Sequence, residues 1–139
     1  MSNGSAPKDL EANYSGYFEC FNAQLFFEAH EVLEDLWLAD RHSPNHAFYK
    51  GLIQFAGAFV HLQKHLENPA KFGHRLRPAS ALFKLARKNL QQYPDEHERL
   101  DVKKTLGLIQ LWLEHLESEN FQKNPLAFVT APKLILQSP

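Results

Sequence analysis

The spacing of large apolar residues constrains this fold most, because they recur every three or four positions along most of the chain. That spacing gathers them on one face of an α-helix, and no run shows the alternation typical of a half-buried strand. The pattern predicts five helices, over about 10–21, 23–39, 44–66, 78–93 and 102–119. The fold class predicted is all-α, a single-domain bundle of about five helices.

Several residues are suited to starting these helices. Asn22 is a good N-cap for the second helix, with Phe21 and Phe26 able to close a hydrophobic staple around it. Asp101 is a good N-cap for the fifth. The stretch between the third and fourth helices predicts one or two helical turns, ended by Gly73 and Pro78.

The two ends of the chain differ from the helical region. Residues 1–8 carry no apolar periodicity and are expected to form a flexible tail, leaving residues 9–139 as one helical domain. From Asn120 onward there are three prolines and the apolar run Lys133 to Leu136. This stretch is too apolar to be left in water, so we expect an extended C-terminal strap packed on the bundle.

Charge and composition exclude several functions. The 139 residues carry 15 basic and 16 acidic side chains, so nothing predicts a nucleic-acid partner. The longest apolar stretch, Leu52 to Leu62, is interrupted by Gln54 and His61 and is too short to span a membrane. Because Cys20 has no second cysteine to pair with and no leader-like segment opens the chain, we expect a cytoplasmic location.

Two ionisable residues of the second helix lie in an apolar setting. At ~100° per residue, His30 and Glu34 fall between Trp37 on one side and Phe27 and Leu38 on the other. They are one helical turn apart, so their side chains can touch. A polar pair flanked by large apolar neighbours is a candidate site.

The third helix carries a matching polar stripe. Gln54 and His61 fall on one side of this helix, with the small residues Gly51 and Gly57 beside them. Small residues there either let another helix approach closely or leave room for a ligand. If the second and third helices form an antiparallel hairpin, the two stripes face each other and four side chains converge: His30, Glu34, Gln54 and His61.

Such a group has two possible chemistries. A carboxylate that holds an imidazole makes a general base, so His30 and Glu34 are the candidate catalytic residues for a hydrolytic or proton-transfer step. Two histidines and a carboxylate can also bind a divalent metal, here His30, Glu34 and His61. The string from His30 to Glu34 differs from the zinc-protease motif HExxH, because Glu34 replaces the second histidine.

A purely structural interpretation is the alternative. The pairs His30–Glu34 and His61–Gln54 then form a buried network that satisfies its own polar groups. The protein would be a homodimeric interaction module, with its interface at exposed aromatic residues of the first helix, Tyr14 and Tyr17, or along residues 121–136. The remaining histidines in turns and polar contexts are expected to be solvated: His42, His46, His74 and His97.

The run FFEAHEVLE at 26–34, followed by Trp37, GLIQ at 51–54 and His61, resembles the family called domain of unknown function 309. These are small all-helical proteins, and the resemblance, which covers about residues 18–66, implies an all-α bundle without an established activity. A departure is Gln24, where members often have glycine. With the signature positions included, the candidate binding residues are Phe27, His30, Glu31, Glu34, Trp37, Gln54 and His61.

Overall fold

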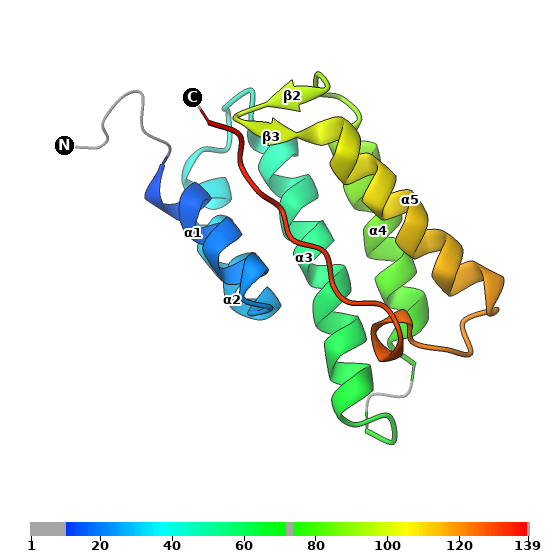
Figure 1. Cartoon of the computed structure of the whole chain (residues 1–139). Helices are drawn as coiled ribbons and strands as arrows, with labels where there is room; N and C mark the ends of the chain where they lie inside the picture. The colour runs from blue at the N-terminus through cyan, green and yellow to red at the C-terminus, as the bar shows by residue number, and fades with distance from the viewer. Residues whose placement is uncertain (1–10, 72–73, 139) are drawn as a thin grey trace.

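Helix α3 (His46–Glu67) is the central element of the structure, a computed structural model that describes residues 11–71 and 74–138. Helices α1 (Ala12–Asn22) and α2 (Phe26–Ala39) lie on one side of it, and α4 (Leu76–Leu90) and α5 (Val102–Ser118) on the other (Figure 1). The predicted all-α bundle is therefore confirmed. The predicted tail 1–8 and Gly73 lie outside the described residues.

An aromatic core joins α3 to its neighbours. The ring of Phe59 contacts Phe26 of α2, Phe83 of α4 and Trp112 of α5, at centroid distances of 5.1, 5.3 and 5.0 Å. All four side chains are buried. Edge-to-face and offset contacts of this kind add to the hydrophobic gain of burial, so one residue ties four helices together.

The first helix turns its tyrosines inward. The Tyr14 hydroxyl donates a hydrogen bond to the carbonyl of Glu98 at 2.8 Å, and the Tyr17 hydroxyl donates to the carbonyl of Leu52 at 2.6 Å. Both side chains are buried, and burial raises the pKa of each phenol. The expectation that they form an exposed interface is wrong, because each hydroxyl has a partner inside the protein.

Helices α3 and α4 approach closely at two glycines. A Cβ atom on Gly51 would lie 2.9 Å from Cγ of Leu90, and one on Gly57 would lie 3.2 Å from Cδ1 of Leu82. The small residues beside the polar stripe therefore serve helix packing. Close contact here fixes the position of α4 relative to the polar stripe of α3.

Helix α1 ends in a Schellman motif, two backbone hydrogen bonds that close the last turn. The N–H of Leu25 donates to the carbonyl of Cys20, and the N–H of Gln24 donates to that of Phe21, both at 2.9 Å. Gln24 adopts a φ of 64°. That left-handed conformation favours glycine, which explains the glycine that the family resemblance leads one to expect at this position.

Replacing Gln24 with glycine is expected to raise the free energy of unfolding by about 0.5–1 kcal/mol, because the side chain is exposed and only its backbone strain is removed. The hydrogen bond that the Gln24 carbonyl accepts from Gln63 is retained. Urea unfolding measures the change. The control Ala23→Gly, at a φ of −89°, is expected to lose stability, and an equal loss for Gln24→Gly would contradict this interpretation of the turn.

The C-terminal strap, residues 128–138, follows a short 3-10 helix η1 (Pro125–Ala127) and runs extended across α3 (Figure 1). The amide of Asn22 donates to the carbonyl of Leu134 at 2.9 Å and accepts from its N–H at 2.8 Å. Helix α2 begins at Phe26, so Asn22 is not its N-cap as predicted: it is the last residue of α1. The predicted strap is present and is held by this residue.

A hairpin of two short antiparallel strands, β2 (Glu96–His97) and β3 (Leu100–Asp101), precedes α5. We predicted that no part of the chain forms a sheet, and this prediction is wrong for the hairpin. Its turn residues Glu98 and Arg99 have φ values of 47° and 65° without being glycine, so the sequence carries no hairpin signal. The side chain of Asp101 accepts from the Lys104 N–H at 2.9 Å, which confirms the predicted N-cap.

Two histidines expected to be solvated are in contact with aromatic rings. His46 stacks on Trp37 with ring centroids 4.9 Å apart. His97 lies 4.7 Å from the ring of Phe48, and its Nε2 is 2.6 Å from Oδ1 of Asn45. Both are half-buried, because the turn before α3 folds back against α2 and the hairpin. His42 and His74 are exposed, as predicted.

Candidate functional site

A cleft of about 490 Å³ opens between α2, α3 and α4. Its walls combine aliphatic side chains with polar and charged ones. The described residues that line it are Phe27, His30, Glu34, Lys50, Ile53, Gln54, Gly57, Val60, His61, Lys64, Arg75, Leu82 and Leu85.

The structure places five of the seven candidate binding residues in this cleft: Phe27, His30, Glu34, Gln54 and His61. Glu31 and Trp37 are absent from the described lining residues. Glu31 is exposed on α2, whereas Trp37 is covered by His46 and by the ammonium of Lys50, 4.2 Å from its ring centroid. The polar stripes of α2 and α3 thus line one cleft, with α4 as a third wall.

His30 and Glu34 come close without forming a hydrogen bond. The distance from Nε2 of His30 to Oε2 of Glu34 is 3.9 Å, and the two side chains are 30% and 42% exposed. A contact of that length is at most a weak ionic one. The carboxylate does not fix the imidazole as a general base requires, and the pair is not a closed, dry network.

Gln54 is oriented by α4. Its Oε1 accepts a hydrogen bond of 2.7 Å from the amide of Asn89, and the side chain is only 9% exposed. Because its oxygen is engaged by Asn89, the amide N–H groups are what Gln54 can offer to a ligand in the cleft.

The partner of His61 is Arg75, the N-cap residue of α4. Nη1 of Arg75 lies 3.0 Å from Nδ1 of His61, and since arginine can only donate, Nδ1 accepts. The predicted pair His61–Gln54 is therefore not formed. Burial, followed by the charges of Arg75 and Lys64, lowers the pKa of His61 below its usual 6.5. The ring is neutral at pH 7 and carries its proton on Nε2, a second donor for the cleft.

Sequence reasoning missed Asn89 and Arg75 because it considered only the second and third helices. A signal was present: Arg75, Leu82, Leu85 and Asn89 follow one another at intervals of seven, three and four residues. That spacing places them on one face of α4. The same stripe supplies the third wall of the cleft and the partners of Gln54 and His61.

Replacing Arg75 with glutamine is expected to raise the pKa of His61 only in part, because burial is the larger cause of its depression. NMR titration of the imidazole measures this pKa. Protonation of His61 opposes folding, so its contribution to stability is complete above pH 6.5 and is lost as the pH falls toward its lower folded-state pKa. Lys88→Gln, on the exposed side of α4, should leave the His61 titration unchanged; a full return to 6.5 in Arg75→Gln would contradict this assignment.

The cleft carries an excess of positive charge. Among the described residues that line it, three are cationic, Lys50, Lys64 and Arg75, and one carries a carboxylate, Glu34. The whole chain has a net charge of −1, so the sign of the charge on these lining residues differs from that of the chain as a whole. A concave site of this sign attracts anions.

The predicted metal ligands do not form a metal-binding group. Within residues 11–71 and 74–138, no three His, Cys, Asp or Glu side chains lie close enough together to hold an ion. His61 uses Nδ1 to accept from Arg75, and His30 and Glu34 are 3.9 Å apart.

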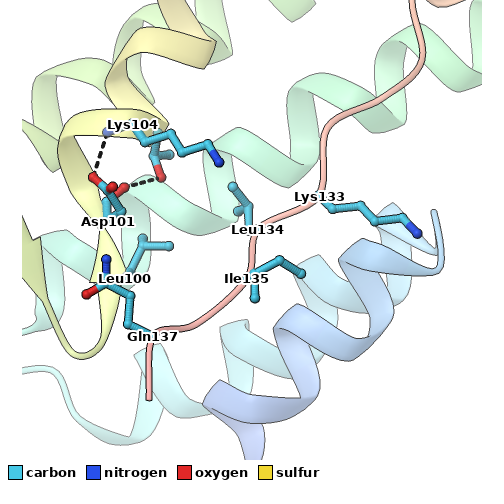
Figure 2. A pocket seen from close by; sticks show the side chains of 8 residues that line it. Leu100, Asp101, Lys104, Lys133, Leu134, Ile135 and Gln137 are labelled. Carbon is cyan, nitrogen blue, oxygen red and sulfur yellow. Dashed lines mark hydrogen bonds between the residues drawn. The ribbon is translucent and has the colours of Figure 1, made fainter. Parts of the chain in front are cut away.

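A second hollow, of about 110 Å³, lies between the strap and the start of α5 (Figure 2). Asp101, Lys104 and Thr105 line one side of it, and strap residues from Lys133 to Gln137 line the other. The polar atoms of Asp101 already cap α5, through Lys104 N–H and the Thr105 hydroxyl, each at 2.9 Å. The larger cleft is therefore the candidate site.

Comparison with known proteins identifies one family. Residues 14–71 match the model of a family described as a domain of unknown function (DUF309). A search of curated proteins finds no match, and neither does a search of solved structures. In the described part of the chain, no helix is long and apolar enough to cross a membrane. The match covers most of α1 and all of α2 and α3, two walls of the cleft included, and it supports the resemblance seen in the sequence.

Proposed function

We propose that this protein binds a small organic anion in the cleft between α2, α3 and α4. The observation that carries the proposal is the charge of that cleft, whose described lining residues include three cations and one carboxylate in a chain of net charge −1. Gln54 and His61 add hydrogen-bond donors. A concave site with cations and N–H donors is complementary to a carboxylate, sulfonate or phosphate.

The ligand also has an apolar part. Aliphatic side chains make up much of the wall, and two large apolar residues at the cleft, Phe27 and Leu85, are 49% and 45% exposed. Large apolar side chains left in water at a concave site are a common feature of ligand-binding surfaces. Their coverage by a ligand supplies hydrophobic free energy that a purely ionic ligand would not gain.

The fluorescent probe anilinonaphthalene sulfonate tests this function, because it joins an apolar body to one anionic group. The wild type is expected to bind one probe per chain, with a Kd in the micromolar range. Leu85→Glu places a carboxylate in the cleft and is expected to weaken binding at least tenfold. The side chain is exposed, so the variant should remain folded.

Leu111→Glu is the matched control. Leu111 is 43% exposed on α5 and does not line the cleft, so the same substitution there should leave the Kd of the probe unchanged. Circular dichroism establishes that both variants are folded. Equal loss of probe binding in the two variants, or none in either, would contradict the proposed function.

A homodimeric interaction module is the alternative function. Burial of Tyr14 and Tyr17 removes the first surface predicted for it, while Phe128 and Ile135 on the strap are 57% and 70% exposed. Light scattering at high micromolar concentration tests it. If the cleft binds anions, the probe is expected to bind whatever the oligomeric state. The Kd of the probe and the molar mass from light scattering therefore test the two functions independently.

A further inference from the structure

The cleft is a long trough. Its lining residues on α3 extend from Lys50 to Lys64, which at 1.5 Å per residue is roughly 21 Å. Helices α2 and α4 flank this line on either side (Figure 1). An elongated ligand can therefore lie along α3 and contact all three helices.

The two ends of the trough differ in charge. Arg75 and His61 are 3.0 Å apart, and the charges of Arg75 and Lys64 both act on the His61 ring, so these three form one end. Lys50 lies at the opposite end, against Trp37. Glu34 comes one helical turn before Trp37 and belongs to the Lys50 end. The described lining residues thus include two cations at one end, and one cation with one carboxylate at the other.

The middle of the trough is mainly aliphatic, formed by Ile53, Val60, Leu82 and Leu85 around Gly57. An apolar trough roughly 21 Å long matches the shape of an extended hydrocarbon chain. A volume of about 490 Å³ holds roughly 16 groups of water size at ~30 Å³ each. That is the size of a medium-length chain with a polar head.

We infer that the ligand is a single-headed acid with an unbranched apolar chain, its acid group beside Arg75 and Lys64 and its chain lying along α3. This inference rests on the proposed function and names its ligand class. The two cationic side chains at one end, compared with Lys50 and the Glu34 carboxylate at the other, set the direction of the chain. The Nε2–H of His61 lies at the same end as Arg75 and can donate to the acid group.

Competition against anilinonaphthalene sulfonate measures the inferred specificity. The competitors are hexanoate, octanoate, decanoate and dodecanoate, with decan-1-ol as the uncharged match for decanoate. Each added methylene is expected to tighten binding about fourfold until the trough is filled. Decanol is expected to bind at least tenfold more weakly than decanoate. Equal affinities along the series, or equal affinities of decanol and decanoate, would overturn the inference.

Two charge-removing variants locate the acid group. Arg75→Gln is expected to weaken decanoate about tenfold and leave decanol unchanged, whereas Lys50→Gln is expected to weaken decanoate less than threefold. A larger effect of Lys50→Gln would place the acid at the other end and overturn the inferred direction. Thermal melts of both variants, together with the unchanged affinity for decanol, separate loss of the acid contact from loss of the fold.

A membrane lipid could offer the same chemistry as a free acid. Sedimentation with phosphatidylglycerol vesicles is expected to leave the protein in the supernatant, and co-sedimentation that Arg75→Gln abolishes would overturn binding of a free acid. The proposed function and this inference fail differently. Absence of probe binding by the wild type would reject the proposed function, whereas probe binding without any dependence on chain length would reject only this inference.

Discussion

Replacing Asn22 with alanine is expected to lower the free energy of unfolding by about 3 kcal/mol, the largest loss of stability that we predict for this chain. The Asn22 amide makes two hydrogen bonds, of 2.9 and 2.8 Å, to the backbone of Leu134. Leu134 is only 4% exposed, so its N–H and carbonyl would lose their partner away from water. Each lost bond costs about 1 kcal/mol, and an unsatisfied buried group costs more.

Denaturant unfolding measures the total effect, and hydrogen exchange at the Leu134 amide measures it locally. If the strap detaches before the bundle unfolds, exchange there will accelerate while exchange within α3 stays slow. Asn13→Ala is the control. That asparagine donates one hydrogen bond from its side-chain amide, to the carbonyl of Val32 at 2.9 Å, and its loss should cost about 1 kcal/mol. An Asn22→Ala variant no less stable than Asn13→Ala would show that the strap does not depend on this amide.

Replacing Gly51 with alanine is expected to lower the free energy of unfolding by about 2 kcal/mol, although alanine is the better helix former. Its Cβ would lie 2.9 Å from Cγ of Leu90, a side chain that is fully buried, and 3.2 Å from Cβ of Asn89, whose position is set by the α4 backbone. Helix α4 must move outward. Because Asn89 holds Gln54, probe binding in the cleft should weaken as well.

Gly107→Ala is the matched control, since Gly107 lies in helix α5 and a Cβ atom added there would meet nothing within 4 Å. There alanine is expected to raise the free energy of unfolding by about 0.5–1 kcal/mol through helix propensity alone. Thermal or urea unfolding of the two variants gives changes of opposite sign. A stabilised Gly51→Ala protein would mean that α3 and α4 do not pack as closely as described.

Helical periodicity was sufficient to predict the fold class, because each helix buries its own stripe whatever its neighbours are. The type and position of Asp101 also predicted its N-cap role, because capping is a local interaction within one helical turn. Asn22 was assigned to the wrong role because its partner Leu134 is far away in sequence. The hairpin turn could not be predicted for a different reason, since Glu98 and Arg99 occupy positions where glycine or asparagine is the usual signal.

The candidate site, like the fold, was predicted only in part. A helical wheel placed His30 and Glu34 on one stripe, and the structure puts both in the cleft. The helical wheel could not identify the partners of Gln54 and His61. Those partners, Asn89 and Arg75, follow the connection between α3 and α4, whose geometry the sequence does not specify. Pairing the polar groups of two helices with each other ignored the third helix, and this error concealed the positive charge contributed by Arg75.

The most direct test of anion binding in the cleft is an NMR titration of the ¹⁵N-labelled protein with anilinonaphthalene sulfonate. Binding at this site predicts saturating shifts at one probe per chain, centred on the amides of Gly57, Val60 and His61, with the amide of Gly107 unmoved. Shifts centred instead on Phe128 and Ile135 of the strap region, or small shifts spread over the protein without saturation, would contradict it.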